Sequence, residues 1–266
     1  MVSASASFTG PEYYDNCLGP IYFDRFAADL VQRLPERPPG DILEVACGTG
    51  LVTKRLRDRI DPSLRLVATD LSDAMLDYAR GKLGERKGIE WREADALKLP
   101  FEDRTFGAVV CGFGIMFVPD RQAMLKEARR VLVDGGIVLF NVWDGIEKSP
   151  HAAICAAVIE AMFPGDAEMR FRIPYDMSDL GYLRQLLAGA RFREMLIETK
   201  RIEIEGVDPR SIATGQILGT PRSALIAKRG VSLDLVVQMV ADALATAGGD
   251  PYSGYAQAVV VQARAI

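Results

Sequence analysis

Short apolar runs alternate with longer amphipathic segments along residues 41–143. The short runs, at about 42–46, 64–69, 89–93, 106–113 and 137–143, are rich in branched side chains and are typical of buried strands. The longer segments, at about 51–60, 71–79 and 120–132, repeat their apolar residues every three or four positions, as amphipathic helices do. Strands that alternate with helices in this way predict an α/β fold, a doubly wound parallel sheet.

The first predicted strand runs into a glycine-rich turn and then a helix. Residues 41–53 read Asp-Ile-Leu-Glu-Val-Ala-Cys-Gly-Thr-Gly-Leu-Val-Thr. Gly48 and Gly50 have no Cβ, so the backbone can come close to a ligand there. The helix that follows offers free N–H groups and the positive end of its dipole. Such a turn suits a nucleotide-like ligand that carries a carboxylate or a phosphate.

Two common phosphate-binding patterns do not fit this turn. A P-loop requires Gly-Lys-Ser/Thr, which is missing here. The dinucleotide fingerprint requires a third glycine, and Thr53 stands at that position. A nicotinamide-dependent oxidoreductase is therefore a poor match, although it stays an alternative.

Acidic residues follow the second and third predicted strands. Asp70 comes 20 residues after Gly50, where a carboxylate can accept hydrogen bonds from both hydroxyls of a ribose. Taken alone, Asp70 could equally be a turn residue or a helix cap. Asp95 ends the third strand as Asp70 ends the second. The carboxyl ends of parallel strands share one edge of a sheet, so Glu44, Asp70, Asp95 and the glycines should meet there.

From residue 144 the pattern changes. Helices are predicted at 149–163 and 176–189, a strand at 192–204, helical stretches within 208–247, and a last strand at 256–265. The stretch from 204 to 255 interrupts what would otherwise be a β-hairpin. It is long enough to form a helical cap.

Composition restricts the classes of partner. The net charge of −4 over 266 residues favours neither nucleic acid nor an anionic membrane as a partner. No apolar run approaches the roughly 18 residues of a membrane span, and residues 1–7 lack the features of a secretion signal. Four scattered cysteines and a single histidine predict no metal site, and free thiols are typical of the cytoplasm.

The string Glu-x-Ala-Cys-Gly-Thr-Gly at residues 44–50 resembles the first motif of class I S-adenosylmethionine-dependent methyltransferases. Residues 129–136, Arg-Arg-Val-Leu-Val-Asp-Gly-Gly, match a second family landmark, with Asp134 in place of the usual proline. The resemblance covers about residues 10–145. It implies a Rossmann-like seven-stranded sheet, mostly parallel with an antiparallel last strand, plus helical cap insertions.

The resemblance also implies the cofactor, S-adenosyl-L-methionine, with S-adenosyl-L-homocysteine as its product. Glu44 would orient the methionyl ammonium group, Asp70 would accept the ribose hydroxyls, and Asp95 would meet the adenine amino group. The cofactor-binding residues expected from the family are Glu44, Ala46, Cys47, Gly48, Gly50, Asp70, Leu71, Met75, Asp95, Ala96 and Gly112.

A closer resemblance is to the ubiquinone and menaquinone biosynthesis methyltransferases, the type 11 group. It rests on residues 89–96, on Leu-Pro-Phe at 99–101, and on Val-Trp at 142–143. This implies a small, partly apolar acceptor such as a quinol or a phenol. The string Asn/Asp-Pro-Pro-Tyr, frequent in enzymes that methylate amino groups of nucleic acids or proteins, is absent after the fourth strand. A protein that binds the cofactor without turnover stays open.

The expected organisation is an N-terminal helical flap at 1–40, a cofactor-binding core at 41–145, and a region at 146–266. The last region would hold the remaining strands and acceptor-cap insertions at about 146–190 and 205–254. A helix is predicted from Pro20 to Leu34, and its aromatic residues either pack inside or cover the cofactor.

His151, near a predicted helix start, could serve as a general base or have no catalytic role. We expect a cytoplasmic protein, and a homodimer is possible.

Overall fold

The computed structural model describes residues 10–84, 88–170 and 172–266. Residues 1–9, which include the stretch expected to lack a secretion signal, lie outside the described residues. The strands are β1 (Ile42–Val45), β2 (Leu66–Asp70), β3 (Ile89–Glu93), β4 (Phe106–Gly112), β5 (Leu132–Trp143), β6 (Phe192–Val207) and β7 (Tyr252–Ala265). The α-helices are α1 (Gly10–Tyr13), α2 (Asp24–Gln32), α3 (Leu51–Arg59), α4 (Asp73–Leu83), α5 (Arg121–Val131), α6 (Pro150–Met162), α7 (Leu180–Gly189), α8 (Pro209–Leu218), α9 (Arg222–Lys228) and α10 (Leu233–Gly248). A π-helix, η1 (Tyr14–Phe23), joins α1 to α2, and the 3-10 helices are η2 (Ile115–Phe117), η3 (Ile146–Lys148), η4 (Ala167–Met169) and η5 (Ile173–Tyr175).

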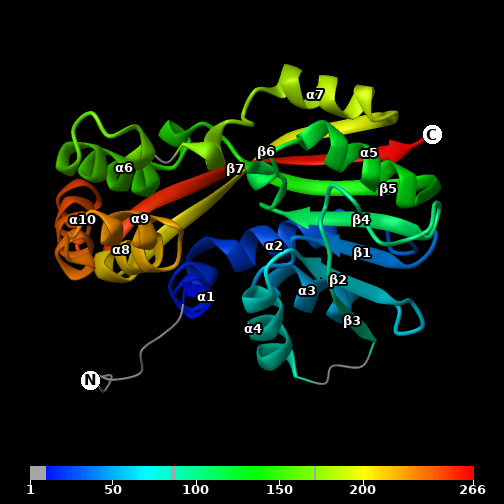
Figure 1. The fold of residues 1–266 in the computed structure, drawn as a ribbon, viewed down its shortest axis with the longest axis horizontal. Helices are drawn as coiled ribbons and strands as arrows, with labels where there is room; N and C mark the ends of the chain where they lie inside the picture. The colour runs from blue at the N-terminus through cyan, green and yellow to red at the C-terminus, as the bar shows by residue number, and fades with distance from the viewer. Residues whose placement is uncertain (1–9, 85–87, 171) are drawn as a thin grey trace. The chain divides into compact units, whose positions relative to one another are not determined.

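The strands form one seven-stranded sheet in the order β3-β2-β1-β4-β5-β7-β6 (Figure 1). Strands β1 to β5 pair in parallel. Strand β7 pairs antiparallel with β5, from Ile137 opposite Arg264 to Trp143 opposite Ala258. The predicted fold class, a mostly parallel seven-stranded sheet closed by an antiparallel last strand, is confirmed.

Helices α2, α3 and α4 cover one face of the sheet. Side chains alternate along a strand, so Ile42 and Glu44 of β1 point to the same face. Ile42 lies in a buried cluster with residues of α2 and α3, and the cluster of Ala68 includes Leu76 of α4. Arg55 of α3 also forms a two-bonded ion pair with Asp24 of α2, at 3.0 and 2.5 Å. Helix α2 is therefore fastened to α3 by both packing and charge.

Several predicted boundaries were wrong, among them the start of the last strand, β7, which begins at Tyr252 rather than at residue 256. The N-terminal helical run begins at Gly10 rather than Pro20, because a π-helix lacks the 3.6-residue period that the prediction searched for. Strand β5 begins at Leu132 rather than Ile137, because residues 133–136 form a bulge where the register jumps. Helix α7 begins at Leu180 rather than 176, where the side chain of Asp179 caps it.

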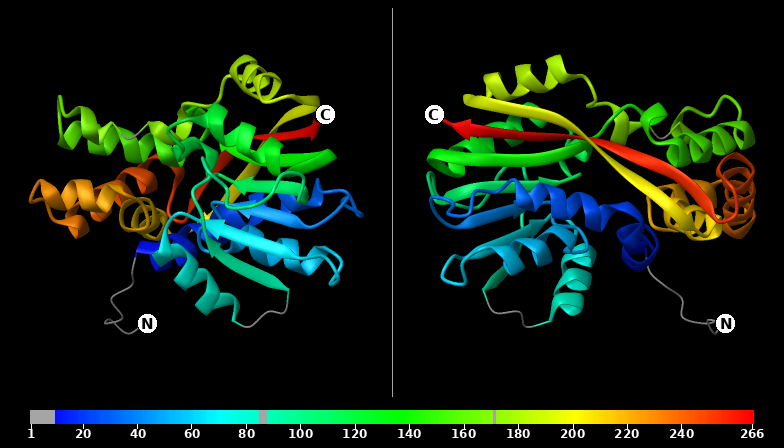
Figure 2. Two further views of the ribbon diagram at one scale, coloured as in Figure 1. Left: turned by 45° about the vertical axis from the view of Figure 1, so that its right-hand side comes forward. Right: turned by 180° about the vertical axis from the view of Figure 1, so that it is seen from behind.

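The described chain packs as two compact units. One unit comprises residues 10–23, 150–170 and 203–255, and the other comprises residues 24–84, 88–149, 172–202 and 256–266. The second unit holds most of the sheet, whose strands are seen from two further sides in Figure 2. The roles expected for the flap, core and acceptor cap stay predictions.

The first unit is a helical bundle in which α8 packs against α10 and η1, and α6 packs against α10 (Figure 1). Gly215 of α8 permits this packing, since a Cβ there would lie 2.5 Å from Leu18 Cδ2 of η1. Two buried polar side chains of this unit, Gln216 and Arg222, form hydrogen bonds. Gln216 Nε2 donates to Tyr22 Oη at 3.2 Å, and Arg222 Nη1 donates to Gln216 Oε1 at 2.9 Å. Helices α6, α8 and α10, which fall in the predicted insertions, therefore share one core, whereas α7 belongs to the sheet unit.

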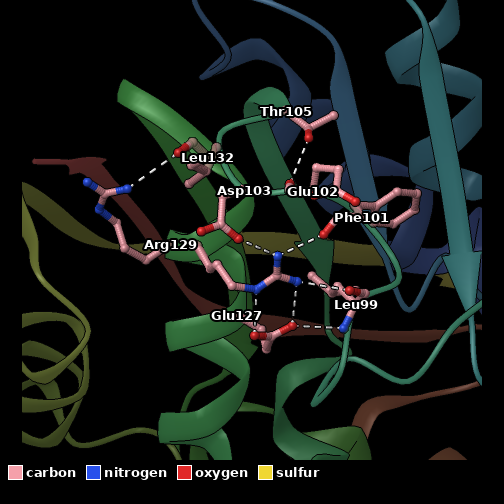
Figure 3. A network of polar contacts seen from close by, with 9 residues as sticks. Leu99, Phe101, Glu102, Asp103, Thr105, Glu127, Arg129 and Leu132 are labelled. Carbon is pink, nitrogen blue, oxygen red and sulfur yellow. Dashed lines mark hydrogen bonds and ion pairs between the residues drawn. The ribbon is translucent and has the colours of Figure 1, made fainter.

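In the sheet unit, Arg130 of α5 holds the loop that leads into β4 (Figure 3). Its guanidinium donates to the carbonyl oxygens of Phe101 and Leu99 and to the carboxylates of Asp103 and Glu127, at 2.7–2.9 Å. Glu127 also accepts the Leu99 N–H at 2.9 Å, and its hydrogen bond with Arg130 lowers the pKa of Glu127. Arg130 and Glu127 therefore fix the connection between β3 and β4.

Candidate functional site

The sheet unit brings the predicted acidic residues and glycines together at the carboxyl ends of its parallel strands. The Gly48 N–H, just after β1, donates to Asp70 Oδ2 at 2.8 Å. The other carboxylate oxygen, Asp70 Oδ1, accepts the Ser72 N–H at 2.9 Å. Both oxygens of Asp70 keep a lone pair for a further donor. The two backbone bonds hold the carboxylate beside the glycine turn.

The two glycines of the turn differ in what surrounds them. Gly48 has φ 54° and Gly50 has φ 79°, both in the left-handed region that favours glycine. A Cβ at Gly48 would meet no atom within 4 Å, whereas a Cβ at Gly50 would lie 3.2 Å from Ala79 Cβ of α4. Gly48 thus borders open space that a ligand can occupy, and Gly50 allows α4 to pack closely.

Two further residues near this edge have strained backbones. Ala46, after β1, has φ 56°, and Phe113, after β4, has φ 57°. Neither residue is a glycine, so each conformation costs about 1–2 kcal/mol. The turns are pressed together, because a Cβ at Gly114 would lie 2.4 Å from Ala46 Cβ. Strain of this kind collects at functional sites, which supports a site at this edge.

Glu44 is a buried carboxyl group beside the same turn. It is 1% exposed, and burial raises its pKa to about 8, with a smaller rise from the negative charge of Asp70. Thr53 of α3 opposes part of that rise in the pKa of Glu44. Among the described residues, neither Glu44 Oε2 nor Thr53 Oγ1 has a hydrogen-bond partner. A buried polar atom without a partner is costly, and a bound ligand can supply that partner.

The remaining predicted residues line the ends of β2 and β3. Asp95 is exposed, and its Oδ1 accepts the Leu97 N–H at 2.8 Å. Leu71 is 68% exposed, unusual for a large apolar side chain, and Met75 is half-buried on the first turn of α4. Ala96 and Cys47 complete the set, and burial raises the pKa of the Cys47 thiol. The roles of these residues in cofactor binding stay predictions.

An aromatic cluster lies at the ends of β4 and β5, and the predicted set of cofactor-binding residues did not include it. Phe113 follows Gly112, and its ring lies 4.5 Å from that of Trp143 and 5.4 Å from that of Phe26, between ring centroids. Asn141, 1% exposed, accepts the Phe113 N–H through Oδ1 at 2.9 Å and so holds the strained turn. The sequence signal was available, since Phe113 and Trp143 end two of the predicted strands at the carboxyl edge of the sheet.

His151 belongs to the helical unit, at the start of α6, as predicted. It is buried rather than on the surface, at 1% exposed, and its Nδ1 lies 3.3 Å from the carbonyl oxygen of Tyr255. A carbonyl oxygen can only accept, so Nδ1 carries the proton and Nε2 does not. Burial lowers the pKa of His151 to about 4, so the ring is neutral at pH 7. Its role as a general base stays a prediction.

The lowered pKa of His151 predicts a loss of stability in acid. Between pH 6.5 and 4 the unfolded chain binds a proton on this residue and the folded chain does not, so stability falls as pH falls. Because His151 is buried, the free energy of unfolding should be about 2 kcal/mol lower at pH 5 than at pH 7. Urea unfolding of the wild type and of His151→Gln at both pH values measures this, because the fixed cost of the substitution cancels. An equal pH dependence in the two proteins would show that His151 is not titrating as described.

A polar hollow of about 340 Å³ lies elsewhere in the sheet unit. It is lined by Asp103, Arg104, Lys126, Arg129, Arg130, Gly189, Ala190 and Arg191. None of the predicted site residues lines it, and its cationic wall is unsuited to an apolar acceptor.

No helix in the described part of the chain is long and apolar enough to cross a membrane.

Comparison with known proteins agrees with this geometry. Residues 43–140 match the family described as a methyltransferase domain. This match covers just over a third of the chain. It runs from Leu43 in β1 to Phe140 in β5 and contains the glycine turn, Asp70, Asp95 and Gly112.

Two curated relatives of the methyltransferase domain are named demethylmenaquinone methyltransferase. The protein of Lactococcus lactis is 37% identical over 118 residues, which cover 44% of this chain and 47% of that protein. The protein of Staphylococcus aureus is 39% identical over 97 residues, 36% of this chain and 40% of that protein. The chain therefore spans less than half the length of these relatives.

Solved structures share the fold around the methyltransferase domain. A Haemonchus contortus phosphoethanolamine N-methyltransferase 2, solved with S-adenosyl-L-methionine, aligns with TM-score 0.62 at 16% identity and covers 97% of this chain and 57% of its own. The YcgJ protein of Bacillus subtilis aligns with TM-score 0.59 at 15% identity, over 91% and 98% of the two chains. At these identities the likeness concerns the fold.

Proposed function

We propose that this protein transfers the methyl group of S-adenosylmethionine to a small, partly apolar aromatic acceptor such as a quinol or a phenol. One observation carries the proposal. The backbone at Gly48 borders open space, and the carboxylate of Asp70 is hydrogen-bonded to that same backbone. A cradle without a side chain, beside a fixed carboxylate at the ends of parallel strands, suits a nucleoside with a charged tail. The match to the methyltransferase domain supports this nucleoside over a dinucleotide.

The residues present fit the cofactor group by group. Asp70 has lone pairs left for two ribose hydroxyls, and exposed Leu71 offers an apolar surface for the adenine ring. Asp95 can accept the adenine amino group, with the backbone at Ala96 beside it. Glu44 has an unpartnered oxygen for the ammonium group. When bound, the cofactor supplies a methyl group that its sulfonium charge already makes electrophilic, so the chain's own task is largely positioning.

The aromatic cluster supports an aromatic acceptor. Phe113, directly after Gly112 at the end of β4, packs against Trp143 at the end of β5. Flat aromatic rings pack well against a flat acceptor ring. The two relatives named demethylmenaquinone methyltransferase support a quinol-type acceptor for the shared domain.

Ligand-induced stabilisation tests the cofactor. S-adenosylhomocysteine at about 100 times its dissociation constant should stabilise the folded protein by about 2.7 kcal/mol, seen as a rise in melting temperature. NAD should give no rise, because Thr53 stands where the dinucleotide-binding fingerprint has its third glycine. A rise with NAD and none with S-adenosylhomocysteine would reverse the assignment.

Turnover tests the rest of the proposal. Incubation with methyl-labelled cofactor and a panel of phenols and reduced quinones should transfer label to at least one acceptor. Label on the panel distinguishes an enzyme from a protein of the same fold that binds the cofactor without turnover. Cofactor binding with no transfer to any acceptor in the panel would favour the second class.

A further inference from the structure

We propose that Glu44 carries a proton in the cofactor-free protein and releases it when the cofactor's ammonium group binds beside it. The inference rests on the proposed function, since it needs an ammonium-bearing ligand at the glycine turn. It adds that binding of the cofactor releases about one proton to solvent and tightens as the pH rises.

The position of Glu44 leaves its carboxyl group out of water. Glu44 lies in β1, opposite Ala68 of β2 and Val110 of β4, and both neighbours are fully buried. Its side chain shares a face with Ile42, under α2 and α3. Glu44 itself is 1% exposed, and its Oε2 has no hydrogen-bond partner among the described residues. An ionised carboxylate in such a position is strongly disfavoured.

Within the part of the chain that the structure describes, the groups that shift the pKa of Glu44 include no positive charge. Asp70 at the end of β2 is acidic, and the thiols of Cys47 after β1 and Cys111 in β4 both feel the negative charge of Glu44. Burial raises the pKa of both thiols, so they stay neutral. Among the described neighbours, Thr53 of α3 favours the ionised form, because its backbone N–H donates to the carboxyl group of Glu44 and lowers the pKa of Glu44 in part. Burial outweighs Thr53, and the pKa of Glu44 rises to about 8.

An arriving ammonium group changes this balance. A positive charge beside the carboxyl group favours the ionised form. The O–H bond of the Glu44 carboxylic acid breaks, the proton passes to water or buffer, and the carboxylate pairs with the ammonium group, which keeps all of its hydrogens. The complex therefore gains a buried ion pair without a buried net charge. Below pH 8 each bound cofactor must displace a proton, so low pH weakens binding.

Calorimetry in two buffers measures the proton directly. S-adenosylhomocysteine is titrated into the wild-type protein at pH 7 in phosphate and in Tris, whose heats of protonation differ widely. The difference in binding heat between buffers should correspond to release of about 0.9 proton per ligand, the fraction of a group with pKa near 8 that is protonated at pH 7. Between pH 6 and 7 the affinity should rise by about tenfold.

Two glutamine variants test whether Glu44 is the source of the proton released on binding. Glu44→Gln keeps the size of the side chain and has no proton to release, so its binding heat should be the same in both buffers and its affinity should be flat between pH 6 and 7. Glu93→Gln is the matched control, because Glu93 is an exposed carboxylate that ends the neighbouring strand β3. On ligand binding, the Glu93→Gln variant should release about as much proton as the wild type does, because it keeps Glu44.

Infrared difference spectroscopy on the wild type gives a second readout should Glu44→Gln fold poorly. Binding should remove the carbonyl band of a protonated carboxylic acid and add carboxylate bands. No saturable heat in either buffer would overturn the proposed function itself. Saturable binding whose heat is the same in both buffers would overturn this inference alone. Release that persists in Glu44→Gln would also overturn it, by assigning the proton to another group.

Discussion

Replacing Gly48 with leucine should lower the affinity for S-adenosylhomocysteine by more than about a hundredfold while the protein stays folded. A Cβ at Gly48 meets no protein atom within 4 Å, so a larger side chain does not disturb the core. It enters the open space in which the cofactor's tail would lie, and the loss corresponds to about 3 kcal/mol or more. Calorimetry or a thermal shift with S-adenosylhomocysteine measures the change.

Gly135→Leu is a matched control for this prediction. Gly135 in the β5 bulge has φ 76°, and a Cβ there likewise meets nothing within 4 Å. Both variants therefore carry a similar backbone strain in the left-handed region, about 1–2 kcal/mol. The Gly135 variant should lose stability to a similar extent yet bind normally. Equal affinity in the two variants would remove the glycine turn from the binding site.

Replacing Asp70 with alanine should weaken cofactor binding by about 1.5–3 kcal/mol, roughly 10- to 150-fold, because two hydroxyl groups lose a charged acceptor. The structure adds a second cause. Asp70 also holds the Gly48 and Ser72 N–H groups, so the variant loosens the turn as well. Calorimetry with S-adenosylhomocysteine gives the affinity.

Two further variants divide these causes. Asp70→Asn should cost less than alanine, but it keeps one accepting oxygen for two backbone donors and should still fall below the wild type. Asp77→Ala removes an exposed carboxylate from α4 whose ion pair is with Arg80 at 3.2 Å, and it should bind as the wild type does. Wild-type affinity in Asp70→Ala would exclude Asp70 from the site.

Much of the sheet followed from local pattern. The predicted strands at 42–46, 64–69, 89–93 and 106–113 correspond to β1, β2, β3 and β4 within two residues, because buried parallel strands are continuous apolar runs bounded by turn residues. The failures were equally physical. The π-helix η1 has a different period from an α-helix, and the register jump at 133–136 depends on how β5 meets β4.

By itself the sequence determined the fold class, the methyltransferase motif and the set of residues at the carboxyl ends of the strands. Spacing along parallel strands is enough to place Glu44, Gly48, Asp70 and Asp95 at one edge, because the edge is defined by strand direction alone. Tertiary structure decided the burial, the hydrogen bonding and the pKa of those residues. Only packing of β1 under α2 and α3 takes Glu44 out of water, and only the contacts of neighbouring elements separate open Gly48 from tightly packed Gly50. Burial, hydrogen-bond satisfaction and pKa depend on atoms from several elements at once, and these are set when the chain packs.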